Sequence, residues 1–231
     1  MEGESESGIT LLELQLRSRH LVRESWRKDA GDLLDAHLLS VTAVAVLVNS
    51  MAGRKFDAIS TDRDSILSLS ASFIQGIDLC ETSISEGLYS QGANLLKQEL
   101  ETIAAIDEHE RGVRRDGKTP NIGRGVTSSY GGVYGDLNGF AHMAKTTLNK
   151  ILHYSEEGDL RGASIVPLYN SEAAKFLYGI HVSLILLHCR QMMMFRAAVF
   201  NDPPHDKAIA IFYEATKILQ RAGVLQGEVL L

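Results

Sequence analysis

Apolar side chains recur at intervals of three and four residues along most of this chain, the pattern of helices that bury one face. Seven segments carry the repeat: 9–26, 32–50, 61–83, 85–111, 134–154, 171–200 and 206–222. The first half of the chain contains no strand alternation and no hairpin dipeptide. The pattern therefore predicts an all-α, single-domain bundle of about seven helices, most of them antiparallel.

The breaks between these segments predict how the chain is organised. Residues 1–8 are acidic and polar, without the pattern of a signal peptide, and we expect them to form a disordered tail. The remaining residues, 9–231, are enough for one domain with a substantial core, and we expect the core helices to lie within about 86–200. The glycine-rich stretch 112–132 predicts the longest loop.

Composition narrows the class of protein. Hydrophobic residues make up 45% and charged residues 23%, which is typical of a globular chain. The net charge of −6 argues against broad nucleic-acid binding but leaves room for a local basic patch. Cys80 and Cys189 are expected to be buried free thiols in a reducing compartment, which favours a cytoplasmic protein. The apolar stretch 38–48 is short for a bilayer and 176–195 carries polar side chains, so we expect no membrane contact.

Two helical segments carry polar residues at helical spacing and form the best candidate site. Lys97 and Glu101 are four residues apart, as are Asn138 and His142, so each pair shares one helix face. Tyr134 lies one turn before Asn138. A histidine beside small and polar residues is a candidate proton donor or acceptor. The structural alternatives are an ordinary surface ion pair and a polar residue that fastens two helices.

Between these segments lies a basic loop that is a candidate phosphate site. Its cationic residues alternate with glycines: Arg111, Arg114, Arg115, Lys118 and Arg124. Such a loop can bind phosphates of RNA or of a nucleotide, and the alternative is a mobile, solvated loop. Residues 112–119 also fit the phosphate-loop pattern, but a predicted helix precedes them and Pro120 follows, so we reject that match.

Local ligand spacings predict no metal and no cofactor. The chain has no Glu-x-x-His or His-Glu-x-x-His motif, and its two cysteines are far apart. His181 and His188 are seven residues apart in an apolar helix. We interpret them as hydrogen-bonded core histidines rather than as metal ligands.

The Lys97–Glu101 and Tyr134–Asn138–His142 motifs resemble those of the HEPN-like helical superfamily, over about residues 86–154. The resemblance implies a helical bundle, often a homodimer, and for many members a ribonuclease of toxin–antitoxin or phage-defence systems. That activity depends on an Arg-x(4–6)-His motif. Here no arginine stands five to seven residues before a histidine. The resemblance implies a bacterial defence or stress protein in which His142 acts as acid or base and Lys97 or Arg124 stabilises charge on RNA.

Two other functions fit the same residues. A non-catalytic interaction module, such as a dimeric scaffold or inhibitor that binds a partner protein, is favoured by the acidic balance and the run Met192–Met194. A small-molecule binder would use the glycine-rich loop as a lid. The long apolar segment 176–195 favours a homodimer in either case.

Overall fold

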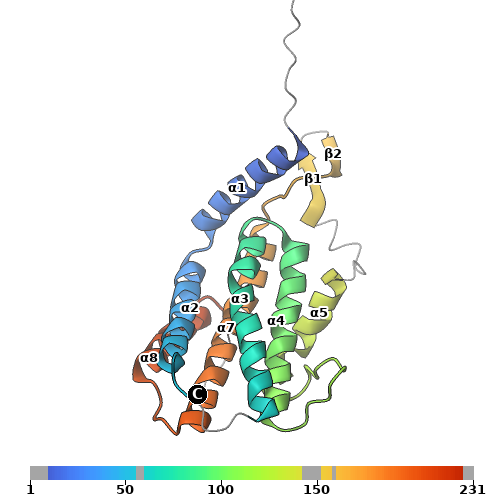
Figure 1. Ribbon diagram of the computed structural model, residues 1–231. Coiled ribbons are helices and arrows are strands. Elements are labelled where there is room, and N and C mark those ends of the chain that lie inside the picture. The colour runs from blue at the N-terminus through green and yellow to red at the C-terminus, as the bar shows by residue number, and fades with distance from the viewer. Residues whose placement is uncertain (1–9, 56–59, 142–151, 158–159, 226–231) are drawn as a thin grey trace, which may run out of the picture.

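A computed structural model describes residues 10–55, 60–141, 152–157 and 160–225 (Figure 1). These residues form seven α-helices, one 3₁₀ helix and one two-stranded hairpin, which confirms the all-α prediction. The α-helices are α1 (Leu11–Asp29), α2 (Asp32–Met51), α3 (Thr61–Ser85), α4 (Tyr89–Glu110), α5 (Gly131–Ala141), α7 (Ser171–Phe200) and α8 (Asp206–Arg221). The 3₁₀ helix η1 covers Gly125–Tyr130, and the strands are β1 (Tyr154–Glu157) and β2 (Leu160–Ala163).

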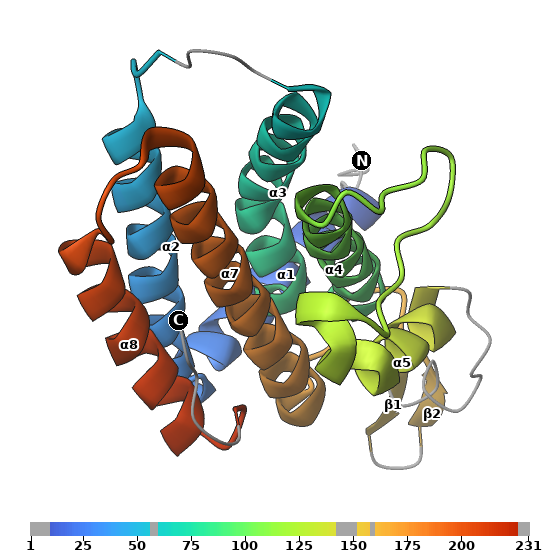
Figure 2. The same ribbon diagram turned by 90° about the horizontal axis from the view of Figure 1, so that it is seen from below.

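The long helix α7 organises the bundle. It packs against α2 on one side and against α3 and α4 on the other, while α8 covers the far side of α2 (Figure 2). A short connection after Ser85 folds α4 back against α3. The hydrophobic core includes side chains from Trp26 on α1 to Leu219 on α8, so it draws on more of the sequence than the predicted range 86–200.

Helix α1 lies beside one end of the bundle instead of inside it (Figure 1). Thr10 and Glu13 form a capping box that starts the helix. Only Val22 and Trp26 of this helix are buried. Ion pairs supplement this small apolar contact: the Arg23 guanidinium lies 2.9 Å from the Glu81 carboxylate of α3.

The chain departs from the predicted elements around residues 125–163. Helix α5 begins at Gly131 and follows η1, so the end of the predicted loop is helical. Tyr154 was expected to end a helix, but it begins β1, which pairs antiparallel with β2 and places Tyr154 opposite Ala163. The sequence Gly158-Asp159 between the strands lies after the end of the predicted helix 134–154 and is a hairpin signal.

Among the described helices, α2 and α7 are long and apolar enough by composition to cross a membrane. Helix α2 has 20 residues, so the shortness of the apolar stretch 38–48 is no argument against spanning. Buried core helices pass the same test, and 56% of the apolar window in α7 is buried in the bundle, against 33% in α2. The finding is weak evidence on membrane contact in either direction.

Candidate functional site

Helices α4 and α5 bring four of the five residues of the predicted acid–base site together. The Tyr134 hydroxyl donates a 2.6 Å hydrogen bond to Oε1 of Glu101. The Lys97 ammonium lies 3.9 Å from the same carboxylate oxygen and 5.8 Å from the centre of the Tyr134 ring. Asn138, one turn further along α5, hydrogen-bonds to the Tyr134 side chain. The predicted pairing of Lys97 with Glu101 is therefore observed, and α5 completes it.

Tyr134 acts as a hydrogen-bond donor within this group and keeps its own proton. Partial burial and the neighbouring Glu101 carboxylate raise the pKa of Tyr134 to about 12, and the Asn138 hydrogen bond only partly opposes the rise. The phenol therefore stays protonated near neutral pH and holds Glu101 in one orientation. The fifth residue, His142, follows α5 directly in sequence and lies outside the described residues.

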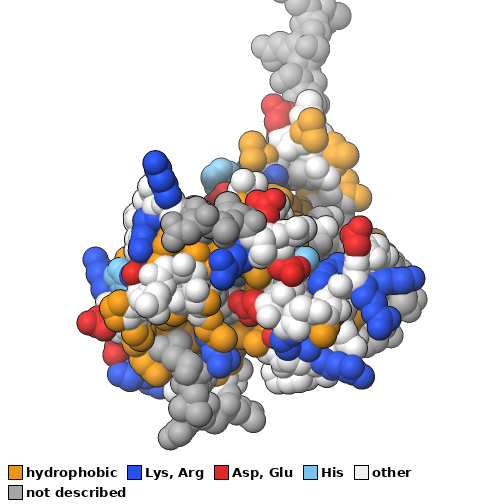
Figure 3. Space-filling model, turned by 60° about the horizontal axis from the view of Figure 1, so that its bottom comes forward, with side chains coloured by type: hydrophobic (Ala, Val, Ile, Leu, Met, Phe, Trp, Pro, Cys, Tyr) orange, Lys and Arg blue, Asp and Glu red, His pale blue; other side chains and the backbone are white. Residues whose placement is uncertain are grey.

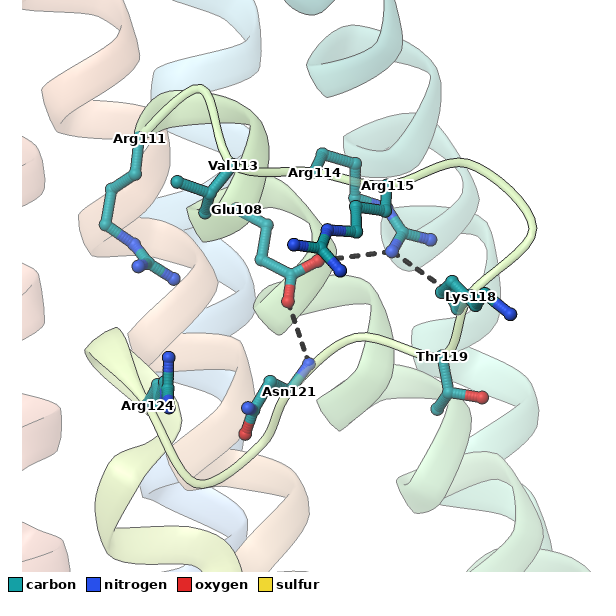
Figure 4. A pocket seen from close by; sticks show the side chains of 9 residues that line it. All are labelled: Glu108, Arg111, Val113, Arg114, Arg115, Lys118, Thr119, Asn121 and Arg124. Carbon is teal, nitrogen blue, oxygen red and sulfur yellow. Dashed lines mark hydrogen bonds and ion pairs between the residues drawn. The ribbon is translucent and has the colours of Figure 1, made fainter.

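The basic loop forms a pocket of about 510 Å³ at the C-terminal end of α4 (Figure 4). All five predicted phosphate-binding residues line it, together with Glu108, Val113, Thr119 and Asn121. Glu108 shapes the pocket, because its carboxylate accepts from Arg114 at 3.1 Å and from the Asn121 backbone N–H at 2.9 Å. Asp107, one residue earlier, accepts from the Arg111 guanidinium at 2.8 Å.

The cations of this pocket fall into two groups. Arg111 and Arg114 are paired with the carboxylates of Asp107 and Glu108. In the described part of the chain, Arg115, Lys118 and Arg124 are exposed and have no carboxylate partner within ion-pair distance. Figure 3 shows Lys and Arg side chains on the right of the view, where this loop lies, and others on the opposite side. The second group is therefore available to bind an anion.

The acid–base group and the basic pocket lie along the same side of α4. Glu101 and Glu108 are seven residues apart, which is two helical turns, or about 10 Å of rise with nearly the same facing. Both α5 and η1 pack against this side of α4. The pair of sites could therefore contact one extended ligand.

Asp107 and Glu108 hold the basic pocket in shape, and no sequence motif indicated them. The motif search considered only the cations of the loop, although Asp107 and Arg111 have the four-residue spacing of a helical ion pair. Glu108 and Asn121 are 13 residues apart and most of the chain between them is irregular, so no sequence spacing indicated their contact.

The two predicted core histidines are both buried, but they differ in their contacts. His181 Nδ1 lies 3.0 Å from Oε2 of Glu99, as expected for a hydrogen-bonded core histidine. His188 packs against the Phe73 ring with 4.4 Å between ring centres. The polar neighbour of the His188 ring is the Gln191 side chain, although neither ring nitrogen reaches full hydrogen-bond geometry among the described residues, so the prediction is confirmed for burial.

Comparison with known proteins assigns this chain to no family. No protein-family model, no curated protein and no solved structure shows a significant match to the chain.

Proposed function

We propose that this chain binds RNA through the basic pocket of the 111–124 loop. The observation that supports the proposal is the group Arg115, Lys118 and Arg124, three exposed cations without carboxylate partners around one hollow. A guanidinium group can donate two parallel hydrogen bonds to one phosphate, and contacts to the phosphate backbone are the largest source of affinity for RNA. A pocket on an otherwise acidic chain confines that binding to one surface.

We further propose that RNA bound there is cleaved without a metal ion, in a bacterial defence or stress system. The 2′-hydroxyl would attack the adjacent phosphorus and the 5′-oxygen would leave, giving a 2′,3′-cyclic phosphate and a 5′-hydroxyl. His142 would take the proton of the 2′-hydroxyl or give one to the leaving 5′-oxygen, with water making the other transfer, and Tyr134 would hold Glu101 in one orientation. Arg124 is the better group to stabilise the phosphate charge, since Lys97 already faces the Glu101 carboxylate.

Binding is tested by fluorescence anisotropy of a labelled single-stranded RNA. The salt concentration is varied from about 50 to about 300 mM, a range over which the release of counterions lowers the affinity measurably. The triple variant Arg115→Ala, Lys118→Ala, Arg124→Ala should bind at least about tenfold more weakly at low salt, and its salt slope should fall by about 2. The control removes three exposed cations from α8, on the far side of the bundle, of which Lys217 is paired with Glu214: Lys207→Ala, Lys217→Ala, Arg221→Ala. Equal losses in both variants would reduce the effect to net charge and contradict the pocket.

Cleavage is tested separately, with total RNA and transfer RNA, in the presence and absence of EDTA. Wild-type protein should release fragments with cyclic phosphate ends, and His142→Ala and Glu101→Gln should not. Circular dichroism of the EDTA-treated protein shows whether the fold survives the chelator. Intact RNA with wild-type protein would refute the cleavage proposal and leave the binding proposal standing.

A second candidate, a non-catalytic module that binds a partner protein or a second copy of the chain, is favoured by helix α1. Several of its leucines are exposed, including Leu12 at 76% and Leu16 at 55%, and Ile165 beside them is exposed at 72%. Helix α7, whose apolar length suggested a homodimer, instead buries most of its apolar residues inside the bundle. Light scattering of the wild type and of the double variant Leu12→Gln, Leu16→Gln tests this. Self-association that the double variant abolishes supports the interaction module. A monomeric wild type excludes the second copy of the chain as the binding partner.

A further inference from the structure

Three helices bring a cysteine, a carboxylate and a histidine together inside the bundle. They are Cys80 of α3, Glu99 of α4 and His181 of α7, with exposed fractions of 0%, 5% and 0%. The Cys80 sulfur, a Glu99 carboxylate oxygen and a His181 ring nitrogen all lie within 4.8 Å of one another. This group lies apart from the basic pocket and takes no part in the proposed RNA site.

Several polar atoms of this interior lack hydrogen-bond partners among the described residues. They include Oε1 of Glu99, Nε2 of His181 and Nε2 of His37. The His37 ring of α2 lies beside that of His181, with 5.4 Å between their centres. Each unsatisfied buried polar atom costs about 1–3 kcal/mol, so their concentration in one place indicates a ligand that accepts lone pairs.

The donor set and its spacing fit zinc. Sulfur, nitrogen and oxygen donors from cysteine, histidine and glutamate are the ligands that Zn²⁺ takes in proteins. Two donors at about 2.0–2.1 Å from a tetrahedral ion are about 3.3 Å apart. Nδ1 of His181 and Oε2 of Glu99 are 3.0 Å apart, so little movement is needed to place an ion between them.

The charges also balance. On binding, the Cys80 thiol would lose its proton to solvent and form the metal–sulfur bond as a thiolate, Glu99 would bind as a carboxylate and His181 as a neutral imidazole. The two negative ligands neutralise the two positive charges of the ion, so the centre would bury no net charge. His37 lies beside His181 but outside this group of three, so the fourth position of a tetrahedral ion would be open to a further ligand such as water.

A simple buried ion pair explains less of this arrangement. It pairs Nδ1 of His181 with one oxygen of Glu99, and the Cys80 thiol adds a hydrogen bond to that carboxylate, but it leaves Oε1 of Glu99 without a partner among the described residues. We propose that Cys80, Glu99 and His181 bind one Zn²⁺ ion that fastens α3, α4 and α7 together.

The test is a zinc titration of chelator-treated, full-length protein against a chromophoric chelator, with metal content measured by mass spectrometry. Wild type should bind one equivalent, and Cys80→Ser and Glu99→Gln should each weaken binding by at least about 100-fold. The controls are Cys189→Ser and His188→Gln, which alter an equally buried cysteine and histidine of α7 that lie outside the group. They should bind zinc within about threefold of wild type.

Cobalt substitution keeps the test decisive if a ligand variant fails to fold. Wild type and Cys189→Ser loaded with Co²⁺ should both show a thiolate-to-cobalt charge-transfer band and the intense visible bands of a tetrahedral ion. Loss of the band in Cys189→Ser would assign the thiolate to the wrong cysteine. The proposal is overturned if wild type binds no stoichiometric zinc, if its cobalt spectrum lacks the thiolate band, or if folded Cys80→Ser binds zinc as tightly as wild type.

Discussion

His188 makes the stability of the bundle depend on pH in a window that can be calculated. Its imidazole is fully buried on α7 against Phe73, and this burial lowers the pKa of His188 to about 4 from an ordinary value of 6.5. As pH falls below 6.5 the unfolded chain takes up a proton here, whereas the folded chain does so only near pH 4. The contribution of His188 to the stability of the folded protein is therefore fully present above pH 6.5, and it is lost as the pH falls from 6.5 to about 4.

The size of the loss follows from the two pKa values. Their difference, converted at 1.36 kcal/mol for each pH unit, predicts that this one side chain removes about 3 kcal/mol of folding free energy by pH 4. Such a loss is a large fraction of the stability of a typical domain.

The assay is urea unfolding of wild type and of His188→Leu at pH 7, 5.5 and 4. Leucine does not titrate, so the wild-type protein should lose about 3 kcal/mol more than the variant between pH 7 and pH 4. His37, whose pKa burial also lowers to about 4, is present in both proteins, and its contribution cancels from the difference. Equal losses, within about 1 kcal/mol, would show that the buried imidazole takes up its proton without penalty and would refute the reasoning.

Three further changes test other parts of the fold. Gly125→Ala should destabilise the protein by about 2–4 kcal/mol in urea unfolding, because the glycine has φ +61° and a Cβ there would collide with the Asp107 carboxylate; a loss below about 1 kcal/mol would contradict this. Tyr134→Phe should cost about 1–2 kcal/mol by the same measurement through the lost bond to Glu101, and unchanged stability would show that water replaces the phenol. Thr10→Ala should cost about 1 kcal/mol and speed amide exchange in the first turn of α1; unchanged exchange would mean that the capping box does not limit fraying.

Local periodicity was sufficient for the helices and for the contacts within one helix. The 3.6-residue repeat placed α2, α3, α4, α7 and α8 within a few residues of their observed ends. The Lys97–Glu101 pair was predictable because both residues belong to one helix, where spacing alone fixes distance.

Contacts between helices were not predictable from spacing. The bond from Tyr134 to Glu101 crosses 33 residues and exists only because α5 docks on α4. Cys80, Glu99 and His181 come from three helices, and the search for local ligand motifs could not detect a group that only packing assembles. The basic loop shows the same limit: its cations were visible, but which of them are neutralised depends on where Glu108 points.

The two halves of helix α1 are held to the bundle by contacts of different strength, so they should differ in the free energy needed to detach them. The half near Trp26 is anchored by a fully buried indole, whereas the half near Leu12 rests on side-chain hydrogen bonds such as that from Ser18 to the Pro167 carbonyl, at 2.6 Å. Raising the ionic strength weakens the pair of Arg19 with Glu86 at the middle of the helix. Helix α1 should therefore behave as a separate cooperative unit that peels from its N-terminal end in concentrated salt, while the amides of α7 keep the protection of the whole bundle.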